Sequence, residues 1–251
     1  MLTLRDVHIH QGQFDLAIDH WQSLPGELHA LLGCNGAGKS TLLRCLGGEL
    51  SHHGSICLHG RELSLWPSSQ RARHLGVLPQ SSRLDFAFSA AEVVALGATP
   101  LRLSWRHLPS AIRTMMELTD CANLAEQAFP SLSGGEKQRV QLARVLLQLS
   151  QAEQAPFLLL DEPTSAQDLH QQHHLLSLVR DLCIRRAYGV VAILHDLNHA
   201  LRYAHTCSVL HQGQLSCQGQ PDNILTPDTV AQHWRYHACS LAYGDGLRVL
   251  V

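Results

Sequence analysis

The stretch GCNGAGKST, Gly33 to Thr41, decides the fold of this 251-residue chain. It follows the apolar run LHALL at 28–32, which predicts a buried strand, and it precedes a predicted helix from Lys39 to about Leu46. Its glycines let the backbone N–H groups curl inward, and the positive end of the helix adds to their attraction for an anion. We therefore predict a phosphate-binding loop between a strand and a helix.

This loop matches the nucleotide-binding pattern G-x-x-x-x-G-K-[ST]. Lys39 is expected to reach the β- and γ-phosphates, and Ser40 to offer its hydroxyl to Mg²⁺. From average residue usage the pattern arises by accident in about one chain in a hundred of this length, which favours function over a chance glycine loop. The predicted nucleotide-binding residues of the loop are Gly33, Cys34, Asn35, Gly36, Ala37, Gly38, Lys39, Ser40 and Thr41.

A second apolar strand is predicted at 156–160, and it ends in the carboxylates of Asp161 and Glu162. A strand that is apolar at every position is buried on both faces, which is typical of a parallel sheet flanked by helices. Ligands bind at the carboxyl edge of such sheets. Asp161 is therefore a candidate Mg²⁺ ligand through water, and Glu162 a candidate to orient or deprotonate an attacking water. An acidic turn without function is disfavoured by the loop upstream.

The string LSGGEKQ at 132–138 predicts the start of another helix. Ser133 and Glu136 have the spacing of a capping box, and apolar residues follow at helical intervals. The same helix start, with Ser133 and the N–H groups of Gly134 and Gly135, also predicts a second phosphate site, and the two interpretations are compatible. Glycines weaken a first turn by roughly 0.5 to 1 kcal/mol each, so we expect another group to approach closely here.

The chain resembles the ATPase subunits of ABC transporters. The resemblance is carried by an ordered set of motifs: Walker A at 33–41, Gln80 closing VLPQ, LSGGEKQ, Walker B at 157–162, the loop SAQD ending in Asp168, and His195 closing VVAILH. It implies an α/β fold, with a P-loop NTPase core of mostly parallel sheet, an N-terminal antiparallel β part and an inserted helical subdomain. One ATP-binding domain is expected over 1–251, with the core at 1–80 and 150–251 and the helical subdomain at about 81–149.

The resemblance also implies roles for single residues. Gln80 resembles the glutamine that contacts Mg²⁺ or the attacking water, and His195 resembles the histidine that steadies the γ-phosphate and keeps Glu162 in line. Asp168 resembles the aspartate that couples two sites, although Gln167 stands where leucine is usual. The implied set is catalytic Lys39, Gln80, Glu162 and His195; Mg²⁺ ligands Ser40, Gln80 and Asp161; and further ATP contacts from Ser133, Gly134, Gly135 and Asp168.

Members of this family work as two copies that face each other head to tail. Each ATP then lies between Lys39 of one subunit and Ser133 of the other, and hydrolysis lets the halves part. The resemblance therefore implies ATP and Mg²⁺ as cofactors, and as partners a second copy (a homodimer), two transmembrane permease subunits and, indirectly, a periplasmic substrate-binding protein. It also implies a peripheral location on the cytoplasmic side of the inner membrane.

The cargo is inferred from finer similarity. The strings VLPQSS, QRVQLARVLLQL, LLLDEPTSAQDLHQQ and ILHDLNHALRYAH most resemble the haem (hemin) importer ATPases, and next those of cobalamin and iron-siderophore uptake. Haem import is expected, with cobalamin or iron-siderophore import as the alternative. A soluble ABC ATPase outside transport is a further alternative, but such proteins usually carry two cassettes or a coiled-coil insertion. A P-loop kinase or GTPase is excluded because neither needs LSGGEKQ.

Composition agrees with this interpretation. A net charge of −2 and a pI of about 6.8 do not suggest nucleic acid as a partner. Eight cysteines without a C-x-x-C pair argue against a zinc site or a disulfide framework and for a reduced cytosol. The apolar runs fall short of the ~18 residues of a membrane span, and the N-terminus lacks the pattern of a signal peptide, so the pore is expected to be another polypeptide.

Two features stay open. By count, His10 falls where relatives stack adenine on an aromatic side chain, and the nearby Phe14 is expected in the core. The chain also has 18 histidines, with pairs such as His170 and His174 at helical spacing. Such pairs can bind metal or haem iron, but solvated surface histidines are favoured.

Overall fold

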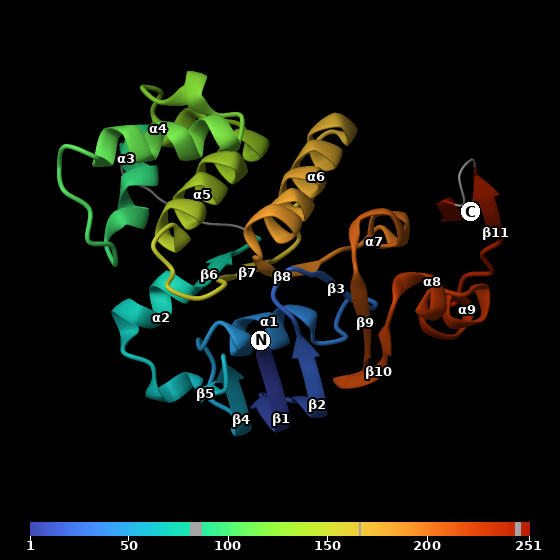
Figure 1. Cartoon of the computed structure of the whole chain (residues 1–251). Helices are drawn as coiled ribbons and strands as arrows, with labels where there is room; N and C mark the ends of the chain where they lie inside the picture. Colours follow the sequence, from blue (N-terminus) through green and yellow to red (C-terminus); the bar gives the residue numbers. More distant parts are fainter. Residues whose placement is uncertain (81–86, 166, 244–246) are drawn as a thin grey trace.

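The computed structural model describes residues 1–80, 87–165, 167–243 and 247–251. Within these ranges, a ten-stranded mixed sheet has the order β5-β4-β1-β2-β10-β9-β3-β8-β7-β6 (Figure 1). The strands are β1 (Leu2–Gln11), β2 (Phe14–Ser23), β3 (Leu28–Leu32), β4 (His53–Leu58), β5 (Arg61–Glu62), β6 (Leu75–Leu78), β7 (Phe157–Leu160), β8 (Gly189–Ile193), β9 (Thr206–His211), β10 (Gln214–Gly219) and the separate pair β11 (Ser240–Tyr243) and β12 (Leu247–Leu250). The helices are α1 (Lys39–Leu46), α2 (Ser68–His74), α3 (Ala90–Ala95), α4 (Leu108–Leu118), α5 (Gly134–Leu149), α6 (Leu169–Arg186), α7 (Leu197–Tyr203), α8 (Pro221–Ile224) and α9 (Pro227–Trp234), with short 3₁₀ turns η1 (Leu63–Leu65), η2 (Leu96–Ala98), η3 (Ala122–Leu124) and η4 (Phe129–Ser131).

The parallel part of the sheet is formed by β9, β3, β8, β7 and β6. Every residue of β3, β7 and β8 is buried, as expected for strands covered on both faces. Leu28, Ala30 and Leu32 pack into the core cluster under α5 and α6, while Leu31 packs into the cluster under α1. Successive side chains of β3 therefore point into two cores, one on each face of the sheet. The carboxyl end of β3 and the loop that follows lie at the edge of the sheet, between the helices that cover its two faces.

The N-terminal part is antiparallel. β1 and β2 form a long hairpin that turns at Gly12, and β4 pairs with the other side of β1. Apolar side chains alternate with exposed ones along both hairpin strands, so one face packs on α1 and the other meets solvent. The predicted fold class is confirmed, since the sheet combines a parallel centre with an antiparallel N-terminal part.

The chain between β6 and β7 is mostly helical. We call residues 87–149 the helical insertion; residues 81–86, the first part of the expected 81–149 segment, lie outside the described residues. α3 and α4 pack on α5 around a small core of their own, away from the sheet (Figure 1). α5 belongs to two cores: Val140 and Leu147 join the cluster of the insertion, whereas Leu142 and Val145 join the cluster of the sheet.

Most predicted bounds agree with the structure, with small shifts. The helix predicted from Lys39 ends at Leu46 as expected, and the strand predicted at 156–160 begins at Phe157. Pro109 occupies the first turn of α4, and the β9–β10 hairpin turns at Gln212 and Gly213.

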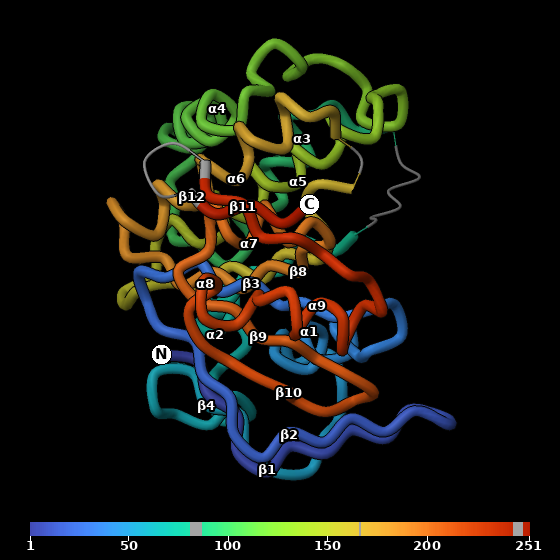
Figure 2. Tube along the Cα trace, turned by 90° about the vertical axis from the view of Figure 1, so that its right-hand side faces the viewer, coloured from blue at the N-terminus to red at the C-terminus, as the bar shows by residue number. Residues whose placement is uncertain are grey.

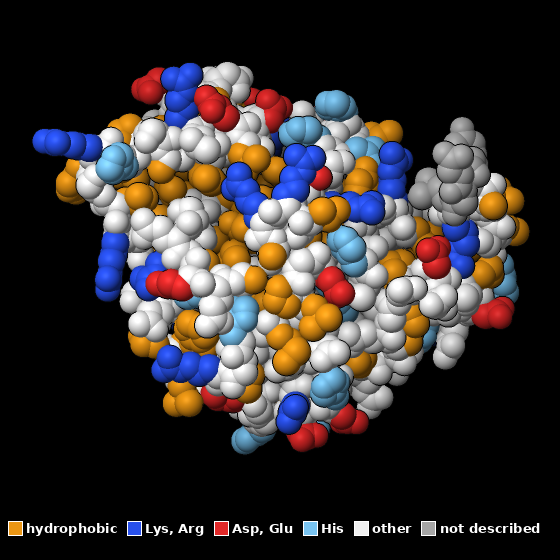
Figure 3. Space-filling view, viewed as in Figure 1, with side chains coloured by type: hydrophobic (Ala, Val, Ile, Leu, Met, Phe, Trp, Pro, Cys, Tyr) orange, Lys and Arg blue, Asp and Glu red, His pale blue; other side chains and the backbone are white. Residues whose placement is uncertain are grey.

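The elements after the β9–β10 hairpin were not predicted. β12 packs on α7, and Figure 2 shows β11 and β12 at the end of the red segment, beyond α8 and α9. Among the described residues, no helix is both long and apolar enough to cross a bilayer. On the face shown in Figure 3 acidic and basic side chains are interspersed, which agrees with the small net charge.

Candidate nucleotide site

The glycine-rich loop leaves β3 in a conformation that only glycine adopts easily. Gly33, Gly36 and Gly38 have φ angles of 141°, 77° and 102°. A Cβ at Gly33 would lie 2.3 Å from the carbonyl oxygen of Leu210, and one at Gly38 would lie 2.8 Å from the Phe14 ring. A backbone carbonyl group and an aromatic ring therefore lie so close to Gly33 and Gly38 that a side chain would not fit at either position.

The first turn of α1 is open to an anion. Its N-cap, Gly38, offers no side-chain acceptor, and the first turn carries no acidic residue. Lys39 Nζ lies inside the loop and donates to the carbonyl oxygens of Gly33 at 2.7 Å and Cys34 at 3.0 Å. Burial lowers the pKa of Lys39, while the carboxylates of Glu162 and Asp161 act in the opposite direction. The loop thus keeps one cation within reach of any phosphate that it binds.

A hydroxyl and a carboxylate meet at the edge of the sheet. Ser40 on α1 donates to Asp161 Oδ1 at 3.1 Å, although the two residues come from separate strand-helix units. Asp161 follows β7 directly and is 9% exposed, and burial raises the pKa of its carboxyl. Two hard oxygen donors side by side are the kind of ligand set that Mg²⁺ prefers. Sequence reasoning predicted both residues as metal ligands, and the structure brings them together.

Glu162 is held from two sides. Its Oε2 accepts from Gln80 Nε2 at 2.6 Å, and its Oε1 lies 2.6 Å from His195 Nε2. The backbone of Glu162 has a φ of 50°, which is rare for a residue other than glycine and is typical of functional sites held by their surroundings. Three polar side chains predicted from distant parts of the sequence therefore converge on one point.

Of these groups, Lys39, Ser40, Gln80, Glu162 and His195 line one cavity of about 480 Å³, whereas Asp161 lies behind Ser40 and is not part of the lining. The cavity is lined by Gln11, Phe14, Asn35, Gly36, Gly38, Lys39, Ser40, Thr41, Gln80, Glu162 and His195. Gln11 and Phe14 were not predicted as site residues. Phe14 was expected in the core, and it does pack against the core beside α1, but it also faces the cavity. His10 is exposed and pairs with Asp15 on the tip of the hairpin, so it does not line this cavity.

Cys34 and Ala37 lie on the other side of the loop. They line a separate hollow of about 360 Å³ together with residues of α9, and Cys34 Sγ donates to the carbonyl oxygen of His233 at 3.0 Å. Of the predicted loop residues, Cys34 therefore turns its side chain away from the nucleotide cavity. Only its carbonyl group, which accepts from Lys39, contacts the site.

The second predicted phosphate site lies elsewhere on the chain. Ser133 caps α5: its Oγ and its N–H both donate to Glu136 Oε2, at 2.7 and 2.8 Å, and the Glu136 N–H donates back at 3.4 Å. Ser133 and Gly134 are exposed, and none of the residues 133–135 lines the cavity described above. Asp168 caps α6 by accepting from the Gln171 N–H at 2.9 Å, and it is also exposed and outside the cavity. The starts of α1 and α5, the two helix ends predicted to bind phosphate, therefore lie apart in one chain.

Gln167 has a contact of its own. Its Nε2 donates to Gln138 Oε1 at 3.0 Å, and Gln138 Nε2 lies 3.5 Å from the carbonyl oxygen of Glu162. Ser165 Oγ donates to the same carbonyl at 3.0 Å. The glutamine that replaces the usual leucine therefore helps to connect α5 with the loop that carries Glu162, which the motif alone did not reveal.

Comparison with known proteins identifies the family. The family model described as ABC transporter matches residues 19–165. The chain belongs to the ABC transporter family. It is 49% identical over 253 residues to the hemin import ATP-binding protein HmuV of Shewanella denitrificans, with 100% of both chains covered, and 50% identical over 218 residues to that of Vibrio cholerae, with 87% of this chain and 84% of the relative covered.

Solved structures agree with this family. An inward-facing metal-chelate type ABC transporter matches with a TM-score of 0.81 at 26% identity, covering 100% of this chain and 97% of the other. An ATP-binding cassette in a dimeric post-hydrolysis state, bound to ADP and Pi, matches with a TM-score of 0.77 at 23% identity, covering 88% and 99%. The second likeness shows the fold alone. This chain is an ABC-type ATPase.

Proposed function

We propose that this ATPase drives an ABC importer and that the cargo of the importer is haem. The convergence of Glu162, Gln80 and His195 beside the phosphate loop supports the catalytic part of the proposal. The cargo is supported by the 49% identity to a hemin import ATP-binding protein over the whole chain. Cobalamin or iron-siderophore import is the alternative from the same architecture.

ATP binding begins at the glycine-rich loop. The loop N–H groups and the open first turn of α1 accept the phosphates, and Lys39 exchanges its bonds to Gly33 and Cys34 for bonds to the β- and γ-phosphates. Phe14, which lies next to the loop on the cavity wall, supplies an aromatic face for the base. Ser40, Asp161 and Gln80 would hold Mg²⁺, and this ion supplies charge neutralisation on the phosphate oxygens.

Glu162 acts on the water that attacks the γ-phosphorus. Its carboxylate accepts a proton from that water as the bond to phosphorus forms and the bond to the leaving oxygen breaks. Gln80 and His195 each contact one carboxylate oxygen, so they fix the orientation of the group that must align the water. His195 is then also positioned to donate to the departing phosphate.

The complete site needs a second copy of the chain. At the start of α5 Ser133 and Gly134 are exposed, and residues 133–135 do not line the nucleotide cavity of their own chain. In a head-to-tail pair this turn, with Ser133, Gly134 and Gly135, contacts the γ-phosphate bound by Lys39 of the other copy. Asp168 lies at the same interface and couples the two sites. The pair works with two transmembrane permease subunits and, through them, a periplasmic binding protein, at the cytoplasmic side of the inner membrane.

Glu162→Gln tests the catalytic proposal. The amide keeps the shape of the side chain and spares the phosphate contacts but cannot take a proton, so ATP binding should persist while hydrolysis falls at least about 100-fold. With ATP and Mg²⁺ the variant should accumulate as a dimer, measured by light scattering. Glu117→Gln, a surface change on α4, is the control and should hydrolyse ATP normally. A monomeric Glu162→Gln protein at saturating ATP, also when bound to its membrane partner, would contradict the proposal.

The cargo needs its own experiment. The ATPase, reconstituted in liposomes with its permease partner, should take up radiolabelled haem only when ATP is present on the ATPase side. Uptake of cobalamin but not haem would transfer the assignment to the alternative. Fractionation separates the remaining class, because a soluble ABC ATPase outside transport should not sediment with membranes.

A further inference from the structure

The two ends of α5 have different surroundings. At its N-terminal end Ser133 and Gly134 are exposed, and Gln138 connects the helix to the catalytic loop by accepting from Gln167 at 3.0 Å and approaching the Glu162 carbonyl oxygen at 3.5 Å. Its C-terminal end is tied down by Gln148, whose Nε2 donates to the carbonyl oxygens of Ala72 at 2.7 Å and Leu75 at 3.3 Å. α5 is therefore hydrogen-bonded to α2 and β6 at the end that lies farther from the predicted ATP contact.

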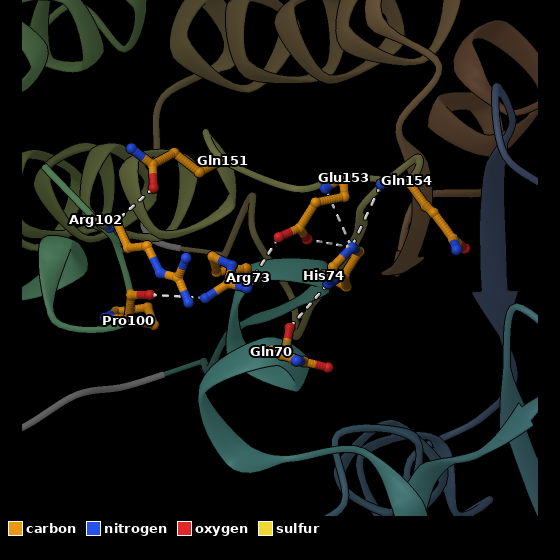
Figure 4. Close-up of polar contacts among 8 residues, drawn as sticks. All are labelled: Gln70, Arg73, His74, Pro100, Arg102, Gln151, Glu153 and Gln154. Atoms are coloured by element: carbon orange, nitrogen blue, oxygen red, sulfur yellow. Dashed lines mark hydrogen bonds and ion pairs between the residues drawn. The ribbon is translucent and has the colours of Figure 1, made fainter.

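Arg73 adds further contacts at the C-terminal end of α5, and we call Arg73, His74, Gln148 and Glu153 the anchor of α5. Arg73 lies in the last turn of α2, and its side chain is 10% exposed. Nη1 donates to the carbonyl oxygen of Pro100 at 3.2 Å, and Nη2 donates to Glu153 Oε1 at 2.9 Å (Figure 4). Pro100 belongs to the helical insertion, and Glu153 lies on the connection from α5 to β7. One guanidinium group thus joins the sheet domain, the insertion and the chain that leaves α5.

His74 holds the same connection from the other side. The backbone N–H groups of Glu153 and Gln154 donate to its Nε2 at 3.2 and 3.3 Å, and its Nδ1 lies 2.8 Å from the carbonyl oxygen of Gln70. Glu153 Oε2 lies 3.1 Å from Nε2, so one carboxylate contacts both Arg73 and His74. A further bond from the Arg102 N–H to Gln151 Oε1 at 2.9 Å ties the insertion to this connection.

Within the anchor, Arg73 carries the buried charge that depends on a partner. A buried guanidinium needs a partner, because removal of its counter-charge leaves an unpaired cation out of water. Glu153 is that partner, and the pKa of its carboxyl is lowered first by a bond from its own backbone N–H and then by Arg73. None of these residues lines the nucleotide cavity. Arg73 can therefore act on hydrolysis only indirectly, either through α5 or through β6, which leads from α2 toward Gln80.

A small rotation of α5 about its C-terminal end would move its N-terminal turn by a large distance. α5 has 16 residues, which correspond to a length of about 24 Å. A tilt of about 10° around its C-terminal end would move the N-terminal turn by about 4 Å, which is more than the length of a hydrogen bond.

We propose that Arg73 is a positioning residue for ATP hydrolysis. Paired with Glu153, it fixes the C-terminal end of α5 and thereby sets the orientation in which the Ser133 end of the helix meets the nucleotide of the second copy. This inference rests on the proposed two-copy site. It assigns to Arg73 no contact with ATP, so the residue should matter for closure of the pair and not for the first binding of nucleotide.

The test separates binding from closure. In the Glu162→Gln background, Arg73→Ala should leave the affinity of the monomer for ATP within about twofold, since the phosphate loop is untouched, and should weaken ATP-driven dimerisation at least tenfold. In the otherwise native chain, it should lower kcat with little change in KM. Glu153→Gln, which keeps one hydrogen bond but removes the charge, should show a smaller loss in the same direction. Arg113→Ala, which breaks the exposed pair with Glu117 on α4, is the matched control and should change neither quantity.

The outcomes are distinct. Normal dimerisation by a folded Arg73→Ala or Glu153→Gln protein overturns the inference and leaves the two-copy site intact. Equal loss of ATP affinity and dimerisation, or a loss that follows thermal stability alone, also overturns it. If the Glu162→Gln parent itself fails to dimerise, the proposed function falls and the inference falls with it.

Discussion

Replacing His29 by glutamine should change how the stability of the protein depends on pH. His29 lies on β3, the strand that leads into the phosphate loop, and is fully buried. Its Nε2 lies 2.7 Å from Ser208 Oγ and its Nδ1 lies 2.9 Å from Thr206 Oγ1, and its ring packs edge-on to Trp21. Burial lowers the pKa of His29 from 6.5 to about 3, because this site disfavours the charged imidazolium.

The sign and size follow from proton linkage. Between the two pKa values the unfolded chain binds a proton at His29 and the folded chain does not, so the contribution is fully present above pH 6.5 and is lost as the pH falls. Each unit costs about 1.4 kcal/mol, and from pH 7.5 to 4.5 the loss from this one residue is about 2.7 kcal/mol. His29→Gln removes the titrating group and keeps a donor and an acceptor for Ser208 and Thr206.

Urea unfolding without nucleotide, measured at half-unit steps from pH 7.5 to 4.5, tests this reasoning. The variant should be less stable at pH 7.5, because the ring no longer fills its site, but the difference in unfolding free energy should shrink by about 2.7 kcal/mol toward pH 4.5. His20→Gln, at an exposed position on β2, controls for the substitution itself. Parallel curves for the wild type and His29→Gln would refute the assignment of this pH dependence to His29.

Two further predictions concern the insertion and the cavity. Gly97→Ala should destabilise the protein by about 1–3 kcal/mol, because the new Cβ would lie 2.1 Å from the backbone oxygen of Arg144 on α5; an unchanged midpoint in thermal unfolding would show that the two segments separate at no cost. Phe14→Ala should weaken ATP binding by about 1 kcal/mol, or roughly fivefold, in a fluorescent-nucleotide titration, whereas His10→Ala should not; the opposite result would move the aromatic platform to His10.

The parts that could be predicted from the sequence have local causes. The buried strand at 28–32 and the helix from Lys39 to about Leu46 each depend on a short run of residues, and the structure contains both. Walker-type spacing also identified Ser40 and Asp161, which lie 3.1 Å apart. Each of these signals lies within a short run of consecutive residues, so it can be interpreted without knowledge of contacts between distant segments.

The parts that could not be predicted depend on segments distant in sequence. Phe14 reaches the cavity because the β1–β2 hairpin packs beside the glycine-rich loop, and its own neighbours in sequence do not indicate this. Arg73 and Glu153 are 80 residues apart and meet only because α5 returns the chain to α2. Nothing in the motif around Cys34 showed that its thiol would face α9 and not the cavity.

The lysine that bonds to its own loop has a consequence for nucleotide binding. Because Lys39 donates to the carbonyl oxygens of Gly33 and Cys34, the curvature of the loop is supported by groups of the chain itself. Binding of a phosphate then needs a change of partner for one side chain and no rearrangement of the backbone, which keeps the entropic cost of binding small.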